Sequence, residues 1–376
     1  MTLPCRLLLV YTIVLLVAGC GPNVAEERAK AARLLDGASI DSAQVLVRAL
    51  SRRHPNDTAV LTLQVRLYSV QRRPMDATSA LRRHDSLAGA HSASLAEVVL
   101  RAGLKDKDES TVTGVLKACG EFALAPMFDA VSSALDDRSP EIRSSAVDAV
   151  VGYKRDGLAD LLAPLMLDDD PLVRAQMFQS AIRLGDRSML QLTRATGLLE
   201  RNDFVKWNYI QMCAVLGQRQ MAERVRRELD NKDDVFRTLA AATLVRLGEK
   251  QRLPIVAAGL RSSEPFARSI AAFTLGDLHA TEYLDSLVNS SRDPDAAVRE
   301  AVAYGLGEIG DSRGAVTLRG LLADREQSVR ARALAALCRL KQSDIDKLAT
   351  MALSDSSGSV RVTAVAVLLA SGTRSR

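Results

Sequence analysis

Residues 295–316 read DAAVREAVAYGLGEIGDSRGAV, and Arg299 in this stretch belongs to a series of basic residues with a nearly constant spacing. Six of the seven intervals in the series are 31 residues long, and the interval that ends at Lys206 is 32. A period between about 20 and 50 residues is typical of a solenoid, whose repeats bury their apolar faces against one another. The sequence therefore predicts a solenoid over the part of the chain that carries the series. Its members are Arg143, Arg174, Lys206, Arg237, Arg268, Arg299, Arg330 and Arg361.

Each repeat has the pattern of a helix–turn–helix. When the basic residue is numbered 0, positions −1, +4 and +7 are apolar in all eight repeats. At 100° per residue these positions lie on one side of an α-helix. Five repeats have glycine at +11, where a helix commonly ends in a left-handed residue, and a second apolar stretch follows.

The basic residue lies within the apolar side of its helix, so it needs an anionic or carbonyl partner. Six repeats have a carboxylate at position −6, just before the helix, where it also suits the positive end of the helix dipole. We predict a structural ladder of arginine–carboxylate pairs that ties adjacent repeats; a row of arginines that binds anions is the alternative. The carboxylates are Asp137, Asp168, Glu200, Asp293, Asp324 and Asp355.

Three segments resemble the HEAT repeat family, in the short form known from phycobilin lyase subunits. They are DPLVRAQMFQSAIRLGD at 170–186, the stretch at 295–316, and QSVRARALAALCRL at 327–340. The resemblance implies an all-α fold, a right-handed α-solenoid that extends over residues 107–376. It implies little about function, because such repeats serve many partners.

The first residues have the pattern of a lipoprotein signal peptide. Arg6 is the one charged residue before a 12-residue apolar core, and residues 17–20 read VAGC. This core is too short to span a membrane. We expect cleavage after residue 19, acylation of Cys20, a short lipidated tether over 20–23, and a bacterial envelope location in which Gly21 favours the outer membrane. The alternative is an ordinary cleaved signal with an incidental cysteine.

Residues 24–106 show a different repeat. Two predicted helix pairs, at 25–50 and 59–87, begin 34 residues apart, with His54 and Pro55 closing the first pair. This spacing is similar to that of tetratricopeptide repeats, although the tryptophan and paired glycines of that family are absent. We place the boundary to the HEAT-like region between 106 and 107.

The composition is that of a globular protein, with 47% hydrophobic and 25% charged residues. Removal of Arg6 leaves 49 basic and 45 acidic side chains, a net charge of +4 that we expect to be spread through the repeats. Nucleic-acid binding normally needs a concentrated basic face, and we expect none. Cys119, Cys213 and Cys338 are expected in the core and unpaired, since they fall in separate repeats.

The sequence contains no recognisable catalytic motif. Its four histidines do not form metal-binding pairs, and His84, Asp85 and His91 make the one cluster worth naming. The glycines between 305 and 314 are expected at helix ends, where they do not form a phosphate-binding loop. We therefore expect no enzymatic activity, no cofactor and no metal.

Candidate partner-binding residues come from the scarce aromatic residues and from the last repeat. Trp207 stands at +1 in the irregular repeat, where we favour a gap-filling role, with a partly exposed, partner-binding side chain as the alternative. Phe273 and Tyr304 share position +5 in adjacent repeats and are expected to stack. The last helix is apolar nearly all round, so we expect Val362 and Val367 to form an open end that docks a partner or a second copy.

These observations favour a non-catalytic, lipid-anchored envelope scaffold that binds a protein or peptide along the solenoid. One alternative is a HEAT-repeat chromophore lyase or a chaperone subunit of a lyase. Another is an assembly factor for outer-membrane or secreted complexes, with the tetratricopeptide-like region as its recruiting module.

The signal peptide leads to a direct prediction. We expect Cys20→Ser to abolish incorporation of labelled fatty acid and to leave the protein uncleaved or soluble, because the serine supplies no thiol for acylation. Metabolic labelling and detergent partitioning measure both effects. Unchanged labelling of the variant would contradict the lipoprotein assignment.

Overall fold

The computed structural model describes residues 23–89, 91–191 and 200–374. Every regular element within these ranges is helical, which confirms the predicted all-α solenoid class. The chain divides into two compact units, residues 1–90 and 91–376. The predicted signal peptide and Cys20 lie outside the described residues. Within the described part, no helix has the length and apolar character needed to cross a bilayer.

The first unit consists of two helix pairs, which agree with the pairs expected from the sequence. Its core contains Val47 and Leu50 from the second helix and Val60 and Leu67 from the third. Asp57 begins the second pair, because its carboxylate accepts hydrogen bonds from the amides of residues 59 and 60. A relation to tetratricopeptide repeats stays a prediction. The helices are α2 (Val24–Asp36), α3 (Ile40–Arg53), α4 (Thr58–Val70) and α5 (Pro74–Ala88).

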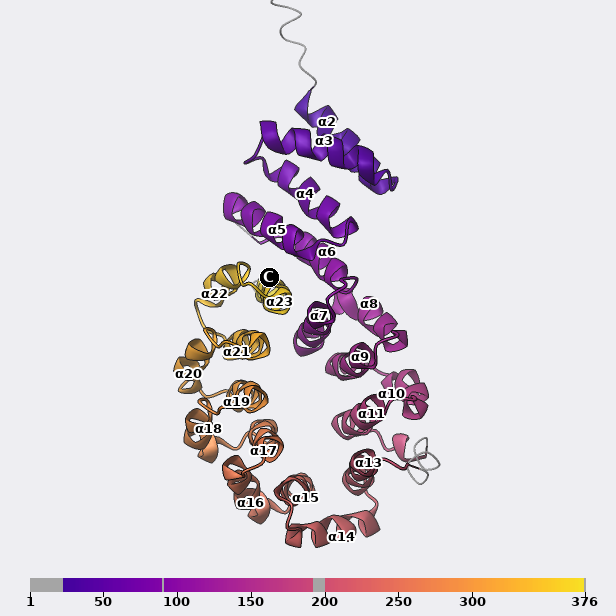
Figure 1. The fold of residues 1–376 in the computed structure, drawn as a ribbon, viewed down its shortest axis with the longest axis vertical. Helices are drawn as coiled ribbons and strands as arrows, with labels where there is room; N and C mark the ends of the chain where they lie inside the picture. Colours follow the sequence, from indigo (N-terminus) through magenta and orange to yellow (C-terminus); the bar gives the residue numbers. More distant parts are fainter. Residues whose placement is uncertain (1–22, 90, 192–199, 375–376) are drawn as a thin grey trace, which may run out of the picture. The chain divides into compact units, whose positions relative to one another are not determined.

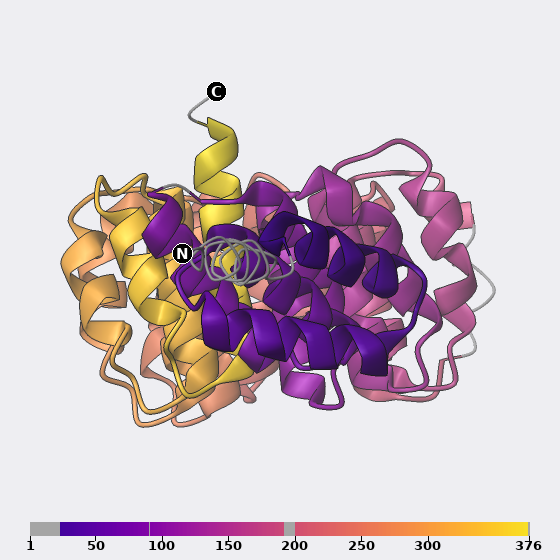
Figure 2. The same cartoon turned by 90° about the horizontal axis from the view of Figure 1, so that it is seen from above.

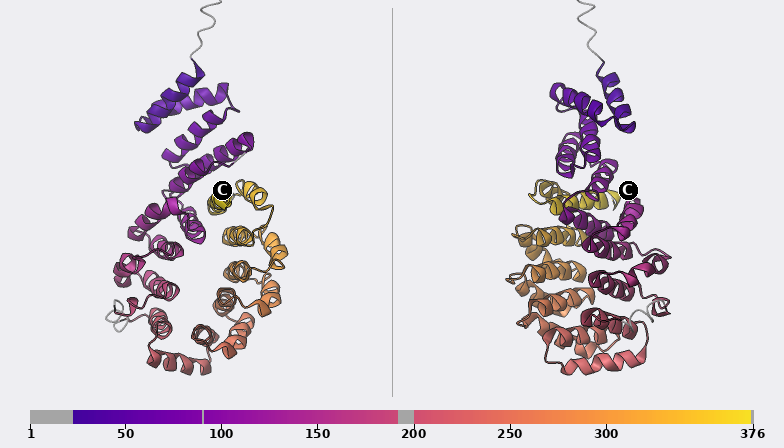
Figure 3. Two further views of the ribbon diagram at one scale, coloured as in Figure 1. Left: turned by 180° about the vertical axis from the view of Figure 1, so that it is seen from behind. Right: turned by 45° about the vertical axis from the view of Figure 1, so that its right-hand side comes forward.

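The second unit begins with α6 (Ala93–Gly103) and continues as a series of long and short helices. The long helices stand side by side as an inner row, and the short helices lie outside them (Figures 1 and 3). The inner row is α7 (Glu109–Phe122), α9 (Pro140–Gly152), α11 (Pro171–Leu184), α13 (Asp203–Val215), α15 (Asp234–Arg246), α17 (Pro265–Asp277), α19 (Ala296–Ile309), α21 (Gln327–Arg339) and α23 (Gly358–Arg374). The outer helices are α8 (Phe128–Ser132), α10 (Leu158–Leu162), α14 (Arg219–Arg227), α16 (Leu253–Ala258), α18 (Leu284–Ser290), α20 (Gly314–Leu321) and α22 (Ile345–Ala352).

Local sequence signals set the ends of the inner helices. Asp295 accepts hydrogen bonds from the amides of residues 297 and 298 at the start of α19. Gly310 ends the same helix with a φ of +76°, which a residue with a side chain rarely adopts. Gly276 and Gly305 let α17 and α19 approach closely, since a Cβ on Gly276 would lie 2.3 Å from the Cα of Gly305. Gly372, by contrast, does not end its helix, because α23 continues to residue 374.

The last inner helix closes the second unit into a ring. α23 packs against both α6 and α7, which start the unit. Val362 is 1% exposed and Val367 is fully buried. The prediction of an open apolar docking end at these two valines is therefore wrong: the helix is apolar on all sides because it is covered on all sides. This packing also joins α6 to the second unit, whereas we expected it in the first.

The closing contact does not follow the register of the other repeats. Between regular neighbours, position +8 of one inner helix meets position +6 of the next, as for Gly307 and Ala336. In α7, Val112 occupies the place of the basic residue, so Gly114 is at position +2. Between α23 and α7, Ser359 at −2 instead meets this Gly114. α7 is thus displaced along α23 by more than one helical turn. α23 has 17 residues where α21 has 13, and its last turns extend beyond the neighbouring helices (Figure 2).

Ring closure predicts long-range coupling of stability. We expect Val362→Glu to lower the midpoint of thermal unfolding by about 5 °C or more, because a carboxylate at this position is buried without a partner. Hydrogen exchange should also accelerate in α6 and α7, which are remote in sequence. Val316, which is 79% exposed on α20, provides the control: Val316→Glu should leave both measurements unchanged. Equal shifts for the two variants, or unchanged exchange in α7, would refute the closure.

Candidate functional site

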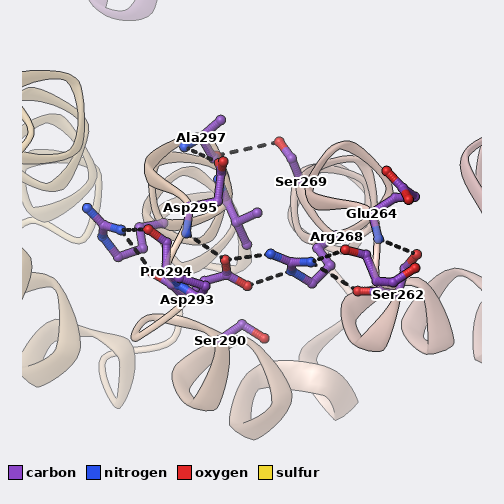
Figure 4. Close-up of polar contacts among 12 residues, drawn as sticks. Ser262, Glu264, Arg268, Ser269, Ser290, Asp293, Pro294, Asp295 and Ala297 are labelled. Carbon is purple, nitrogen blue, oxygen red and sulfur yellow. Dashed lines mark hydrogen bonds and ion pairs between the residues drawn. The ribbon is translucent and has the colours of Figure 1, made fainter.

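The arginine ladder joins each inner helix to the next repeat. Arg268 donates from Nε and Nη2 to the carboxylate of Asp293, at 2.7 and 2.9 Å, and from Nη1 to the carbonyls of residues 262 and 263 (Figure 4). Asp293 also accepts from the amide of Asp295 at 2.9 Å. One guanidinium thus links the loop before its own helix to the loop before the following helix.

Five arginines share this arrangement, and each pairs with the carboxylate that precedes the next inner helix. The sequence suggested the side chain at −6 in the same repeat as a candidate partner. The residue at that position instead contributes its backbone carbonyl. The pairs are Arg143–Asp168, Arg174–Glu200, Arg268–Asp293, Arg299–Asp324 and Arg330–Asp355. The predicted ladder between adjacent repeats is therefore present, and each of these arginines donates four hydrogen bonds, as Arg143 does.

The ladder carboxylates are ionised in the folded protein. The hydrogen bond from Arg299 lowers the pKa of Asp324 and outweighs the opposite effect of burial. Arg174 lowers the pKa of Glu200 in the same way. These shifts mean that the ion pairs stabilise the fold at neutral pH and lose that contribution as the pH falls through the lowered pKa values.

Two arginines of the series depart from the pattern. Arg237 bonds to Asp234 in its own helix and to the carbonyl of residue 231. Arg361 is 5% exposed, donates to the carbonyl of Asp355, and has a buried Nη2 atom without a hydrogen-bond partner among the described residues. Burial lowers the pKa of Arg361. The displaced closure explains this residue, because no following repeat stands in register with α23.

The inner face of the ring contains a second set of ion pairs, between helices that are far apart in sequence. Glu121 on α7 accepts from Arg332 and from Nε of Arg339, at 2.9 Å for the latter, and both arginines lie on α21. Arg339 also bonds to Glu308 on α19 at 2.7 Å. Lys117 on α7 lies 3.5 Å from Glu300 on α19. The contacts of Glu121 and Lys117 cross the closing junction of the ring, whereas Arg339–Glu308 joins the adjacent helices α21 and α19.

A polar cavity of about 110 Å³ adjoins these ion pairs between α7, α19, α21 and α23. Lys117, Glu121, Glu300 and Arg332 line it, so two positive charges face two negative ones. Burial raises the pKa of Glu300, but Lys117 and Arg332 lower it further, and the net shift is downward. Its ionisable groups are engaged with one another, and Glu300 also bonds to the side chain of Ser328.

The aromatic residues that the sequence singled out differ in their surroundings: two stack against each other and one is buried. Phe273 and Tyr304 stack as expected, with ring centroids 4.3 Å apart and planes 5° from parallel. Arg332 lies over the Tyr304 ring at 5.5 Å. Trp207 is only 4% exposed and packs edge-on against Phe236. Trp207 therefore fills the space between α13 and α15, as favoured from the sequence, and the alternative of an exposed partner-binding side chain is wrong.

The sequence analysis missed an apolar strip at position −2 of three inner helices. Leu172, Phe204 and Phe266 are 48%, 42% and 49% exposed. Phe204 and Phe266 are two repeats apart, yet their ring centroids lie 5.9 Å from each other. Position −2 in other repeats carries residues such as Glu141, Ala297 and Ser359, and a comparison of repeats at this position would have revealed the strip.

No cluster of metal-binding side chains occurs in the described ranges. Nδ1 of His84 lies 2.9 Å from a carboxylate oxygen of Asp85. Cys119, Cys213 and Cys338 are buried, as the sequence predicted. Burial raises the pKa of the Cys119 thiol to about 12, so it is not a reactive thiolate at neutral pH.

Comparison with known proteins supports the repeat assignment. The family model for HEAT repeats matches residues 256–338. The second unit is thus an all-α solenoid of HEAT-like repeats. No curated protein matches the sequence.

Several solved structures are similar to this chain. One is the complex of CpcE and CpcF of phycocyanin lyase from Nostoc sp., with 15% identity, a TM-score of 0.40, and coverage of 66% of this chain and 94% of that chain. Another is human deoxyhypusine hydroxylase in complex with glycerol, with 18% identity, a TM-score of 0.40, and coverage of 66% and 96%. A third is an engineered protein with 14% identity, a TM-score of 0.35, and coverage of 82% and 98%.

The ladder predicts a large cost for removing one arginine. Arg299 and Asp324 have side chains only 8% and 9% exposed. We expect Arg299→Ala to destabilise the protein by about 3–5 kcal/mol, because it leaves a buried carboxylate without its partner. Chemical unfolding measures the loss, and Arg325→Ala is the control, since the Arg325 side chain is 75% exposed. A negligible difference between the two variants would show that the ladder is not structural.

Proposed function

We propose that this protein is a non-catalytic scaffold, anchored by lipid to the bacterial cell envelope, that binds a protein partner through its second unit. The observation that carries the proposal is the strip formed by Leu172, Phe204 and Phe266. Large exposed apolar side chains that lie against one another, as Phe204 and Phe266 do, are typical of protein interfaces, and aromatic residues often supply most of the binding energy.

The charged side chains of the inner face are already paired, which favours the strip as the binding surface. Glu121 pairs with Arg332 and Arg339, and Glu300 pairs with Lys117, across the closing junction. A partner that entered between them would have to replace these interactions. The strip at position −2 needs no such exchange, because its side chains already contact solvent.

Site-specific crosslinking tests this function in cells. A photoreactive phenylalanine analogue at position 204 or 266 should crosslink one defined protein, whereas the same analogue at exposed position 316 should not. We expect Phe204→Ser combined with Phe266→Ser to weaken binding of that protein at least about tenfold, because two central apolar contacts are removed. Crosslinks that do not differ between positions 266 and 316 would exclude the strip as the binding surface.

A further inference from the structure

The net charge of the chain is confined to the first unit. Residues 23–90 contain 11 basic and 7 acidic side chains, a net charge of +4, whereas residues 91–376 contain 38 of each. The expectation that the charge would be spread through the repeats is therefore wrong. Charge that is concentrated in one small unit creates a local positive potential that attracts acidic groups.

Within this unit, three arginines converge on one groove. The groove has a volume of about 280 Å³ and lies between α3 and α4. Arg48, Arg52 and Arg73 line it, and none of the lining side chains is acidic. Arg73 bonds to Asp76 at 2.8 Å and lies over the ring of Tyr68 at 4.9 Å.

Arg48 and Arg52 are exposed arginines of the first unit that line the groove. They are one turn apart on α3, and like charges at this spacing destabilise a helix by a few tenths of a kcal/mol. Neither makes an ion pair with any residue that the structure describes. Arg28, Arg53 and Arg66, by contrast, pair with Asp57, Glu27 and Asp36. Two guanidinium groups are thus directed to the groove without an anion from the first unit.

The other groove residues fit a peptide better than a bare ion. The amides of Gln44 and Gln71 bond to each other at 2.5 Å, and Gln64 adds an amide that both donates and accepts, as a peptide backbone does. The Oε1 atom of Gln71 is buried and has no hydrogen-bond donor among the described residues. The half-buried ring of Tyr68 adds aromatic surface, which a peptide segment covers and a phosphate or a lipid headgroup does not.

We propose that this groove binds an acidic segment of a protein partner, with Arg48 and Arg52 pairing with its carboxylates. The inference rests on the proposed function, since it assigns a chemical class to the partner of the scaffold. Arginine suits this role because its planar guanidinium forms two parallel hydrogen bonds with one carboxylate. The amide side chains then hold the backbone of the segment between its acidic residues.

The test uses the full chain in detergent and a fluorescent peptide of alternating aspartate and alanine, with an asparagine–alanine peptide of equal length as its control. Fluorescence anisotropy should show saturable binding of the aspartate peptide that weakens with salt. We expect Arg48→Gln combined with Arg52→Gln to raise the dissociation constant at least about tenfold. Arg33→Gln combined with Arg83→Gln removes the same charge from exposed positions outside the groove and should change it less than about twofold. Matching circular dichroism spectra establish that all variants fold.

Each outcome bears on the proposal. Equal binding of the two peptides, or equal losses in the two double variants, would overturn the assignment of the groove. Displacement of the peptide by inorganic phosphate at equal charge concentration would identify a small-anion site instead. Binding to vesicles that contain phosphatidylglycerol, with the same dependence on Arg48 and Arg52, would identify a membrane contact. If the crosslink from position 266 forms while the aspartate peptide fails to bind, the scaffold function stands and this inference falls.

Discussion

The pairing of one buried arginine with the carboxylate of the next repeat is the interaction on which the second unit depends. A buried ion pair stabilises a fold only when its hydrogen bonds are complete, because removing both charges from water is costly. In the five regular pairs of the ladder, the guanidinium bonds to one carboxylate and two carbonyls, as Arg299 does with Asp324 and residues 293 and 294. The same geometry forms across the 31-residue intervals and across the 32-residue interval that follows Arg174, where Glu200 lies one residue further along the chain.

The irregular repeats show what happens where an arginine–carboxylate pair of the ladder is missing. Lys206 replaces an arginine, Ser262 stands where a carboxylate is expected, and Arg237 bonds within its own helix. In this part of the ring, Phe204 and Phe266 meet although a whole repeat separates them. The closing junction also lacks an arginine–carboxylate pair of the ladder. There the buried apolar surface of α23 and the ion pairs of Glu121 hold α7 in place. The contact of Phe204 with Phe266 and the displacement of α7 thus occur where the ladder is interrupted, whereas other exposed apolar residues, such as Val316, lie beside intact pairs.

The sequence was sufficient to predict the features that repeat and insufficient for those that do not. Helix bounds, caps and the ladder depend on residues a fixed distance apart, so a single repeat reveals them. Ring closure joins residues more than 200 positions apart, such as Glu121 and Arg332, and no periodic signal marks such a contact. The same limit explains Val362. An apolar helix at a chain end and an apolar helix that closes a ring have the same pattern, and only their neighbours distinguish them.

The two proposed recognition surfaces differ in their physical character, and this difference suits a scaffold. The strip of Leu172, Phe204 and Phe266 offers apolar area, whose contribution to binding grows with the surface removed from water and depends little on salt. The arginine groove of the first unit offers charge, which accelerates encounter and selects acidic partners but weakens as ionic strength rises. The second unit has no net charge of its own. Electrostatic selection therefore rests with the first unit, and the affinity that persists at high ionic strength rests with the ring.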